Sequence, residues 1–266
     1  MPELDHNGVT LHYEVEGSGP TLLLLSGMLS DSATWAPLLP LLAGYRVVRI
    51  DNRATGRTVP LDAPVDMAIM VGDALAVMDH LGCDRFHIAG HSMGGLMGLE
   101  IAGVAPERVA SLSVMASGRV RIPRINGVFD ALVAVRKGPE GERLWLRALY
   151  PWVFGSAFFE DPETAELTVE AALAYPHAQT LGAMKHQIAM FKQMRLVADL
   201  RTLTLPVQVM YGTEDVLVPP EMAQPGFAVL PNLTEHWLEG AGHSVVWDAT
   251  QTVAEHLNAF IAAHPI

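Results

Sequence analysis

A serine between two glycines is the residue of this chain best placed to do chemistry. Gly90, Ser92 and Gly94 form a G-x-S-x-G pattern, in which the serine occupies a strained turn between a strand and a helix. The glycines carry no side chain, so the strand and the helix can approach each other closely. The apolar stretch 85–89 and the small-residue stretch 93–104 supply the strand and the helix that this turn requires. The pattern therefore predicts Ser92 as a nucleophile.

Two later residues are predicted to supply an acid and a base. Asp215 follows the apolar stretch 207–211, and His243 follows the predicted strand 234–239. Because the carboxyl ends of parallel strands meet at one edge of a sheet, we expect both side chains to lie near Ser92. Glu214 is the alternative acid. We favour Asp215 because neighbouring residues of an extended segment point to opposite sides.

These residue types together indicate nucleophilic catalysis. A serine hydroxyl attacks efficiently only when a neighbouring base accepts its proton. His243 would accept that proton, while Asp215 would fix the tautomer of the imidazole and stabilise the imidazolium. The tetrahedral oxyanion needs preorganised donors, and we expect the backbone N–H groups of Met28 and Met93 to provide them. This chemistry calls for no cofactor and no metal.

The strands and helices that must position these residues are predicted from stretches typical of strands and of helices, which alternate along the chain. Strands that alternate with helices at such spacings imply a parallel sheet with right-handed crossovers. Asn7-Gly8 lies between two stretches with partial alternation and predicts a hairpin that precedes this sheet. The predicted strands are 3–6, 9–16, 21–25, 45–50, 85–89, 109–116, 207–211 and 234–239, and the predicted helices are 32–44, 67–81, 93–104, 221–229 and 250–263.

Residues 119–195 interrupt the alternation. They contain no stretch typical of a buried strand and are rich in aromatic and methionine side chains. We therefore expect a helical cap, inserted into a core domain formed by residues 1–118 and 196–266. Apolar side chains of this cap would cover Ser92 and bind substrate. The candidates are Trp145, Trp152, Phe154, Phe158, Met184, Met190 and Phe191.

Composition excludes several classes of partner. The 266 residues include 17 Lys and Arg against 29 Asp and Glu, a formal charge of −12, which argues against nucleic acid or an anionic membrane surface. The longest apolar run is too short to cross a bilayer, and the first residues lack the pattern of a signal peptide. A single cysteine, Cys83, forms no intrachain disulfide and fits a reducing compartment. We expect a cytoplasmic protein.

Several motifs, taken jointly, resemble those of the α/β-hydrolases. They are Gly-His-Ser-Met-Gly-Gly around Ser92, the Gly-x-x-Asp-x-x-Val-Pro spacing from Gly212 to Pro219, and the Gly-x-Gly-His that ends at His243. The resemblance covers nearly the whole chain and includes the order serine, aspartate, histidine. It implies an α/β-hydrolase fold: a mostly parallel eight-stranded sheet with helices on both faces and a helical cap insertion.

One position departs from the common pattern of these hydrolases. Ser26-Gly27 stands where most members have His-Gly, and a similar polar residue occurs here in 3-oxoadipate enol-lactonases. Ser26 would leave a small polar group beside the oxyanion hole, with room for a compact cyclic ester. Cap residues Arg143, Arg147, Lys185, Lys192 and Arg195 could instead recognise a carboxylate, although long basic side chains on helices usually end in solvent.

The sequence thus predicts a serine hydrolase that cleaves a small-molecule carboxylic ester or lactone with an apolar moiety, through an acyl-enzyme. Two alternatives stay open: a C–C bond hydrolase or lyase that uses the same triad, and a non-catalytic ligand-binding homologue. The acyl chain, the alcohol and the oligomeric state, a homo-oligomer included, are not specified by the sequence.

Overall fold

An eight-stranded sheet organises the chain, which the computed structural model describes over residues 2–266; Met1, the first residue of the N-terminal segment considered above, lies outside the described residues. The strand order is β1-β2-β4-β3-β5-β6-β7-β8. The strands are β1 (Glu3–His6), β2 (Val9–Glu16), β3 (Thr21–Leu25), β4 (Arg46–Ile50), β5 (Phe86–His91), β6 (Val109–Met115), β7 (Val207–Gly212) and β8 (Leu233–Leu238). β1 and β2 are antiparallel to their neighbours and the remaining pairs are parallel, which confirms the predicted sheet.

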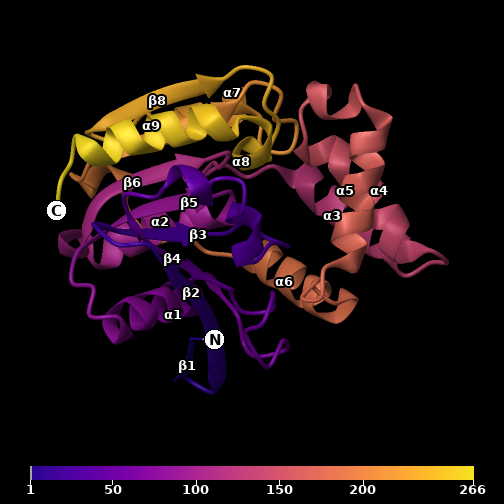
Figure 1. Ribbon diagram of the computed structural model, residues 1–266, viewed down its shortest axis with the longest axis horizontal. Coiled ribbons are helices and arrows are strands. Elements are labelled where there is room, and N and C mark those ends of the chain that lie inside the picture. The colour runs from indigo at the N-terminus through magenta and orange to yellow at the C-terminus, as the bar shows by residue number, and fades with distance from the viewer. Residues whose placement is uncertain (1) are drawn as a thin grey trace.

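Helices cover both faces of this sheet (Figure 1). The α-helices are α1 (Met67–His80), α2 (Met93–Val104), α3 (Pro123–Arg136), α4 (Gly141–Val153), α5 (Pro162–Ala174), α6 (Leu181–Gln193), α7 (Pro220–Phe227), α8 (Val245–Asp248) and α9 (Thr250–Ala262). Short 3-10 helices are η1 (Ser32–Trp35), η2 (Leu39–Leu41), η3 (Pro106–Arg108), η4 (Ser156–Phe159) and η5 (Leu200–Thr202). None of the helices within residues 2–266 is long and apolar enough to cross a membrane.

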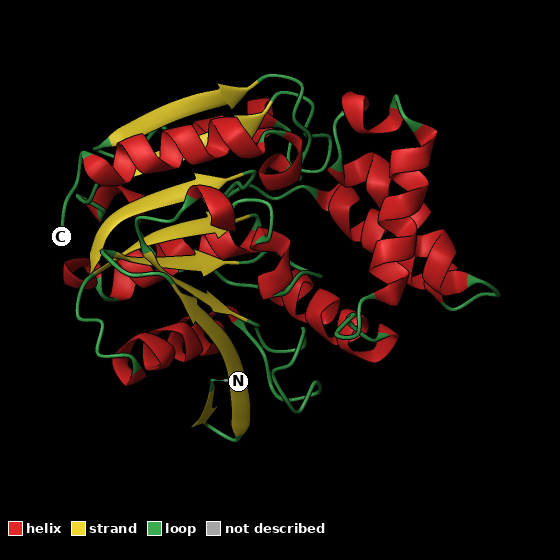
Figure 2. Cartoon of the chain, in the orientation of Figure 1, coloured by secondary structure: helices red, strands yellow, loops and turns green. Residues whose placement is uncertain are grey.

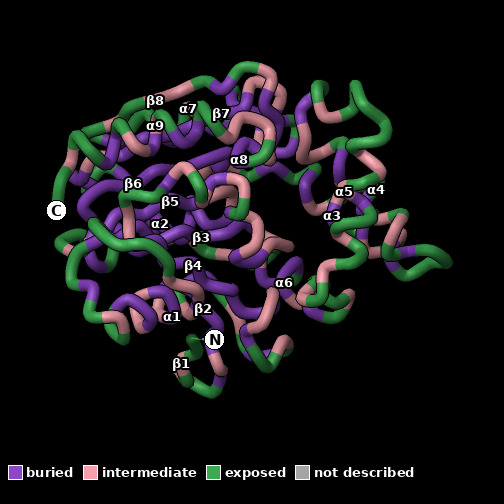
Figure 3. Tube along the Cα trace, viewed as in Figure 1, coloured by how far each residue is buried: buried purple, intermediate pink, exposed green. Residues whose placement is uncertain are grey.

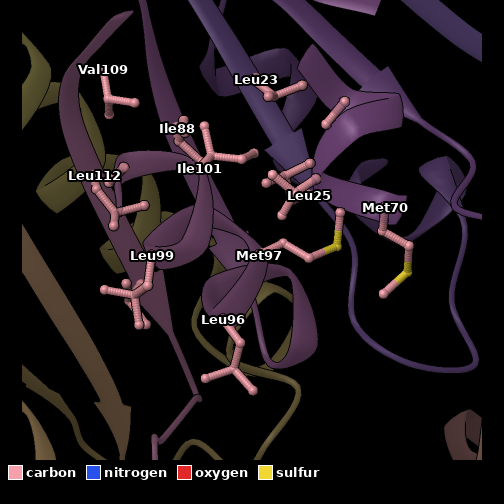
Figure 4. Close-up of a cluster of buried hydrophobic side chains, with 14 of the residues drawn as sticks. Leu23, Leu25, Met70, Ile88, Leu96, Met97, Leu99, Ile101, Val109 and Leu112 are labelled. Atoms are coloured by element: carbon pink, nitrogen blue, oxygen red, sulfur yellow. The ribbon is translucent and has the colours of Figure 1, made fainter. Parts of the chain in front are cut away.

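Successive side chains of β3 enter two hydrophobic clusters, because neighbours on a strand point to opposite faces. Leu23 and Leu25 pack in a cluster with residues of α1, α2 and α7. Leu22 and Leu24 pack in another with residues of η1, α8 and α9. Figure 2 shows helices on either side of the strands, and Figure 4 shows Met97 of α2 beside Leu25 in the first cluster. A continuous apolar strand is therefore buried on both faces, as predicted.

The first hairpin has the geometry that its turn residues predict. Asn7 has a φ of 48° and Gly8 a φ of 78°, and a type I′ turn needs positive φ at both central positions. The turn brings β1 beside β2 in antiparallel register.

The predicted helix over residues 32–44 is wrong. The segment forms η1 and η2, two short 3-10 helices, instead of a continuous α-helix. Pro37 and Pro40 have no backbone N–H and break the hydrogen-bond pattern of an α-helix. Trp35 is nevertheless fully buried against the sheet, so the apolar pattern identified the buried face correctly.

Helices α3 to α6 lie between β6 and β7 in the chain and stand beyond the carboxyl ends of the strands (Figures 1 and 2). In Figure 3 this part of the chain carries more exposed and intermediate positions than the buried strands do. Its long basic side chains mostly pair at the surface: Arg143 contacts Glu166 and Glu170, and Arg147 contacts Glu166. These two arginines are therefore held by carboxylates of the same helical segment.

We predict that Gly94→Ala strongly destabilises the protein. A Cβ at Gly94 would lie 1.9 Å from the backbone oxygen of Leu25, so α2 would have to move away from β3. We expect a loss of more than about 3 kcal/mol in the free energy of unfolding, measured in urea, or failure to fold.

Gly72→Ala is the matched control. Gly72 lies inside α1, and a Cβ there would meet nothing within 4 Å. Alanine favours a helix over glycine by about 1 kcal/mol, so this variant should gain stability. A wild-type urea midpoint for Gly94→Ala would contradict the close approach.

Candidate active site

Ser92 occupies a strained turn between β5 and α2. Its φ of 53° and ψ of −118° lie outside the regions that non-glycine residues usually adopt. The Ser92 N–H donates to the oxygen of Met115 at 2.8 Å, and the Ser92 carbonyl accepts from Ser117 Oγ at 2.7 Å. These bonds tie the turn to the end of β6. The strain is the kind that a nucleophile elbow stores to present its hydroxyl.

A hydrogen-bonded chain joins Ser92, His243 and Asp215. His243 Nε2 lies 2.9 Å from Ser92 Oγ, and its Nδ1 lies 2.8 Å from Asp215 Oδ2. A carboxylate only accepts hydrogen bonds, so Nδ1 carries a proton, and in the neutral imidazole Nε2 is then free to accept one from the serine. His243 and Asp215 are 4% and 3% exposed.

The other oxygen of Asp215 fixes the direction of its carboxylate. Asp215 Oδ1 accepts from the N–H groups of Leu217 at 2.9 Å and Val218 at 2.7 Å. Glu214 points elsewhere and accepts from the N–H and the hydroxyl of Ser156 at 2.6 and 2.5 Å. The structure thus brings Asp215, and not Glu214, to the imidazole.

His91 packs directly against this arrangement, and sequence reasoning gave it no role. Its ring centroid lies 5.0 Å from that of His243, and its Nε2 lies 2.8 Å from the His243 backbone oxygen. A carbonyl oxygen only accepts, so Nε2 is the protonated nitrogen. Burial, followed by the charge of His243, lowers the pKa of His91 to about 4. The neutral ring therefore acts as a hydrogen-bonding support for the His243 loop.

Two backbone N–H groups are placed as the sequence predicts for an oxyanion hole. Met93 follows Ser92 at the first position of α2, and Met28 follows Gly27 at the end of β3. A Cβ at Gly27 would lie 3.1 Å from the Ser92 Cβ, so the two turns are in contact. Within residues 2–266, neither N–H donates to an acceptor of the protein. Both groups are thus available to a ligand.

Gln187 of α6 supports the turn that contains Met28. Its Oε1 accepts from the N–H of Leu29 at 2.7 Å, and the side chain is fully buried. Leu29 has a φ of 65°, an uncommon conformation for a branched side chain that needs support from its surroundings. Sequence reasoning missed Gln187, because a glutamine on an amphipathic helix gives no local signal of such a contact.

A cavity of about 220 Å³ opens at Ser92 and His243. Its walls are mainly apolar and come from the turn after β3, from α3, α4 and α6, and from the loops after β7 and β8. They include Met28, Leu29, Ile125, Phe129, Leu149, Tyr150, Val153, Phe154, Phe191, Leu217, Val218, Val246 and Trp247. Phe154 and Phe191 are the predicted cap residues that the structure brings to this cavity.

The other predicted substrate-binding residues lie elsewhere. Helices α3 to α6 bury many of their large apolar side chains against one another, which sequence periodicity alone does not separate from a cavity wall. Trp145 lies over the guanidinium of Arg136, Phe158 stacks on Phe154, and Trp152 packs in a cluster with residues of α3 and α6. Met184 is fully buried in the same cluster, and Met190 packs in the cluster that contains Leu23 and Leu25.

Ser26 is also not a cavity residue, which corrects the expectation from its position. It is fully buried, accepts from Trp35 Nε1 at 3.0 Å and donates to the oxygen of Asp31 at 2.9 Å. Its hydroxyl therefore fastens η1 to the end of β3.

Comparisons with known proteins identify the class to which this fold and site belong. A model of the alpha/beta hydrolase family matches residues 22–256. The chain belongs to the alpha/beta hydrolase family.

Individual relatives are named as several kinds of enzyme. The chain is 32% identical over 239 residues to the "Putative carbamate hydrolase RutD" of Variovorax paradoxus, covering 88% of this chain and 89% of the relative. Two solved structures share the fold. The first is a thermophilic esterase from Thermogutta terrifontis, with a TM-score of 0.84, 22% identity and 100% of both chains covered. The second is the enol-lactonase from Burkholderia xenovorans LB400, with a TM-score of 0.80 and 24% identity, covering 98% of this chain and 100% of that one. The family and these relatives support hydrolase activity.

We predict that two histidines of β5 make the protein less stable in mild acid. Burial is the first cause that lowers the pKa of both His87 and His91 to about 4, from an ordinary value of 6.5. Between these values the unfolded chain binds protons that the folded chain does not, so the free energy of unfolding falls as the pH drops from 6.5 toward 4.

His87→Gln tests this dependence away from Ser92. His87 is 1% exposed and contacts Ser111 Oγ through Nδ1. In urea titrations the variant should lose less stability between pH 7 and pH 5 than the wild type, while His80→Gln, at an exposed position, should behave as the wild type. Equal losses in all three proteins would contradict the assignment.

Proposed function

We propose that this chain is a serine hydrolase that cleaves a carboxylic ester or lactone with an apolar moiety through an acyl-enzyme. The observation that carries the proposal is the continuous hydrogen-bonded chain from Asp215 through His243 to Ser92, at the mouth of a largely apolar cavity. We also propose that residues 119–195 act as the cap of this site.

The proposed mechanism assigns one task to each group. Ser92 Oγ attacks the substrate carbonyl carbon while His243 Nε2 accepts the hydroxyl proton, and Asp215 stabilises the resulting imidazolium. The N–H groups of Met28 and Met93 stabilise the oxyanion. His243 then returns the proton to the leaving oxygen as the C–O bond breaks, and water hydrolyses the acyl-enzyme by the same relay.

Apolar walls favour the hydrophobic part of an ester or lactone. Aromatic and aliphatic side chains exclude water from the reacting carbonyl and strengthen the electrostatic contacts made there. Because Ser26 does not border the cavity, its identity gives no support to a preference for lactones over open-chain esters. A carbamate, named for the relative of 32% identity, offers Ser92 a similar carbonyl and belongs in the substrate panel.

We predict that Ser92 is the residue labelled by a serine-directed fluorophosphonate. Mass spectrometry of the digested protein should place the adduct on Ser92. Ser92→Ala should lower kcat for a p-nitrophenyl ester by at least about 10⁴-fold, as loss of a catalytic serine does elsewhere.

Circular dichroism and the urea midpoint of Ser92→Ala should match the wild type, so that lost turnover reflects lost chemistry. An adduct found only on another residue would refute the mechanism. Labelling at Ser92 with cleavage of a vinylogous diketone, but of no ester, lactone or carbamate, would assign the chain to the C–C hydrolases. Absence of both labelling and turnover would favour a non-catalytic binder.

We predict that Asp215→Asn and Glu214→Gln differ greatly in turnover. Asparagine would favour the wrong tautomer of His243, a defect worth about 10⁴ in kcat in serine proteases. Glu214 contacts Ser156 instead, and glutamine keeps an acceptor oxygen for that contact, so we expect less than about a threefold change. Similar losses in the two variants would overturn the choice of acid.

A further inference from the structure

Ser92 borders a second cavity, larger than the first. This cavity measures about 480 Å³ and extends from Ser92 and Met93 past the segment 117–122 to residues 191–196 at the end of α6. The cavity described above measures about 220 Å³ and shares Ser92, Ile125, Phe191 and Val218 with it. The serine hydroxyl thus stands where two spaces meet, and each space is available to one half of a substrate.

The two spaces differ in charge. Arg119, Arg121, Lys192 and Arg195 line the larger cavity, with no carboxylate among its lining residues. The lining of the smaller cavity includes no lysine, arginine or carboxylate. Four cations around one space are unexpected in a chain in which acidic residues outnumber basic ones by 29 to 17. Such a space attracts an anion.

The contacts of each basic side chain show whether it is available to bind a ligand in the larger cavity. Arg119 donates to the backbone oxygens of Leu196 and Ala198, so its guanidinium is fixed without a carboxylate contact. Asp199 is close enough to feel the charge of Arg119 but binds Arg201.

Lys192 is paired, whereas two arginines are not. Lys192 Nζ lies 2.5 Å from Asp130 Oδ1. Arg121 and Arg195 are exposed, and neither has an ion-pair partner among residues 2–266. These two side chains are the ones that an entering anion can engage, with Arg119 as a fixed charge in the same lining.

The position of His243 indicates which half of the substrate enters each space. His243 borders the smaller cavity and is absent from the lining of the larger one. The leaving oxygen must take its proton from His243 Nε2, so the alcohol half lies in the smaller, apolar space. The two proposed oxyanion donors border one space each, Met28 the smaller and Met93 the larger, so the carbonyl lies where the spaces meet and the acyl half extends into the larger one.

We propose that the substrate is a monoester of a dicarboxylic acid, with an apolar alcohol in the smaller cavity and the free carboxylate beside Arg121 and Arg195. The inference rests on the proposed serine hydrolase function and specifies its substrate class. Ser92 forms the acyl bond as the alcohol leaves with the proton from His243. Water then releases the dicarboxylate and regenerates the serine.

Two matched pairs of esters test the class. Mono-p-nitrophenyl adipate and suberate differ from p-nitrophenyl hexanoate and octanoate only by a carboxylate in place of the terminal methyl group. After subtraction of the rate without protein, we expect kcat/KM for at least one monoester to exceed that of its neutral partner by about 10-fold or more. Added salt should reduce this ratio.

Variants connect the preference to the two arginines. Arg121→Gln and Arg195→Gln should each raise KM for the preferred monoester about 5- to 10-fold, leave its kcat nearly unchanged and spare the neutral ester, because they remove binding and not chemistry. Arg147→Gln, which removes the same charge from α4 outside both cavities, is the control and should change none of these values.

The outcomes separate this inference from the function on which it rests. Cleavage of both esters of each pair at equal rates, unaffected by Arg121→Gln and Arg195→Gln, would refute the dicarboxylate class and leave the hydrolase function intact. A preference for the hexanoyl ester of p-hydroxybenzoate, which carries its carboxylate on the alcohol half, would refute the assignment of the acyl half. If Ser92 is not labelled and no ester is cleaved, the proposed function itself fails.

Discussion

The close approach of α2 to β3 is the constraint on which the whole site depends. The backbone of Gly94 lies against the backbone oxygen of Leu25, and that of Gly90 against the oxygen of Gly94 itself. No side chain fits in these spaces. In the turn between β5 and α2, Ser92 has its strained conformation and lies beside the turn that follows β3. Close backbone packing therefore brings Ser92 and both proposed oxyanion donors together, and the side chains of Ser117 and Gln187 support the two turns.

The remaining groups reach Ser92 because their loops are tied to one another as well as to the sheet. Asp215 is held by N–H groups of its own loop, and its free oxygen holds His243. His91, on the strand that leads to the serine, binds the backbone of His243. Three loops thus share one hydrogen-bonded arrangement. A displacement of any of these loops would move the imidazole of His243, whose two nitrogens must both be placed for their hydrogen bonds.

The sequence predicts those parts of the fold and site that depend on local patterns. Most of the parallel strands follow from short apolar runs, and glycine spacing and positions after strands predicted that Ser92, Asp215 and His243 lie together, as they do in the structure. Prediction failed where packing between distant segments decides. Two prolines break the expected helix over 32–44, while Trp145 and Met184 pack against other side chains of helices α3 to α6. Ser26 has the polarity of a site residue, but its bond partners lie inside the protein.

The contact between Gln187 and Leu29 has a consequence for engineering the enzyme. The helix that carries Gln187 belongs to the segment over the sheet, yet its side-chain oxygen holds the backbone beside Met28. Exchanging that segment would therefore change more than the selectivity for substrates. A chimera that replaced residues 119–195 with the corresponding segment of a relative would also exchange the acceptor for the Leu29 N–H. Such a graft must bring its own buried acceptor to that position, or the turn after β3 in the recipient loses its shape.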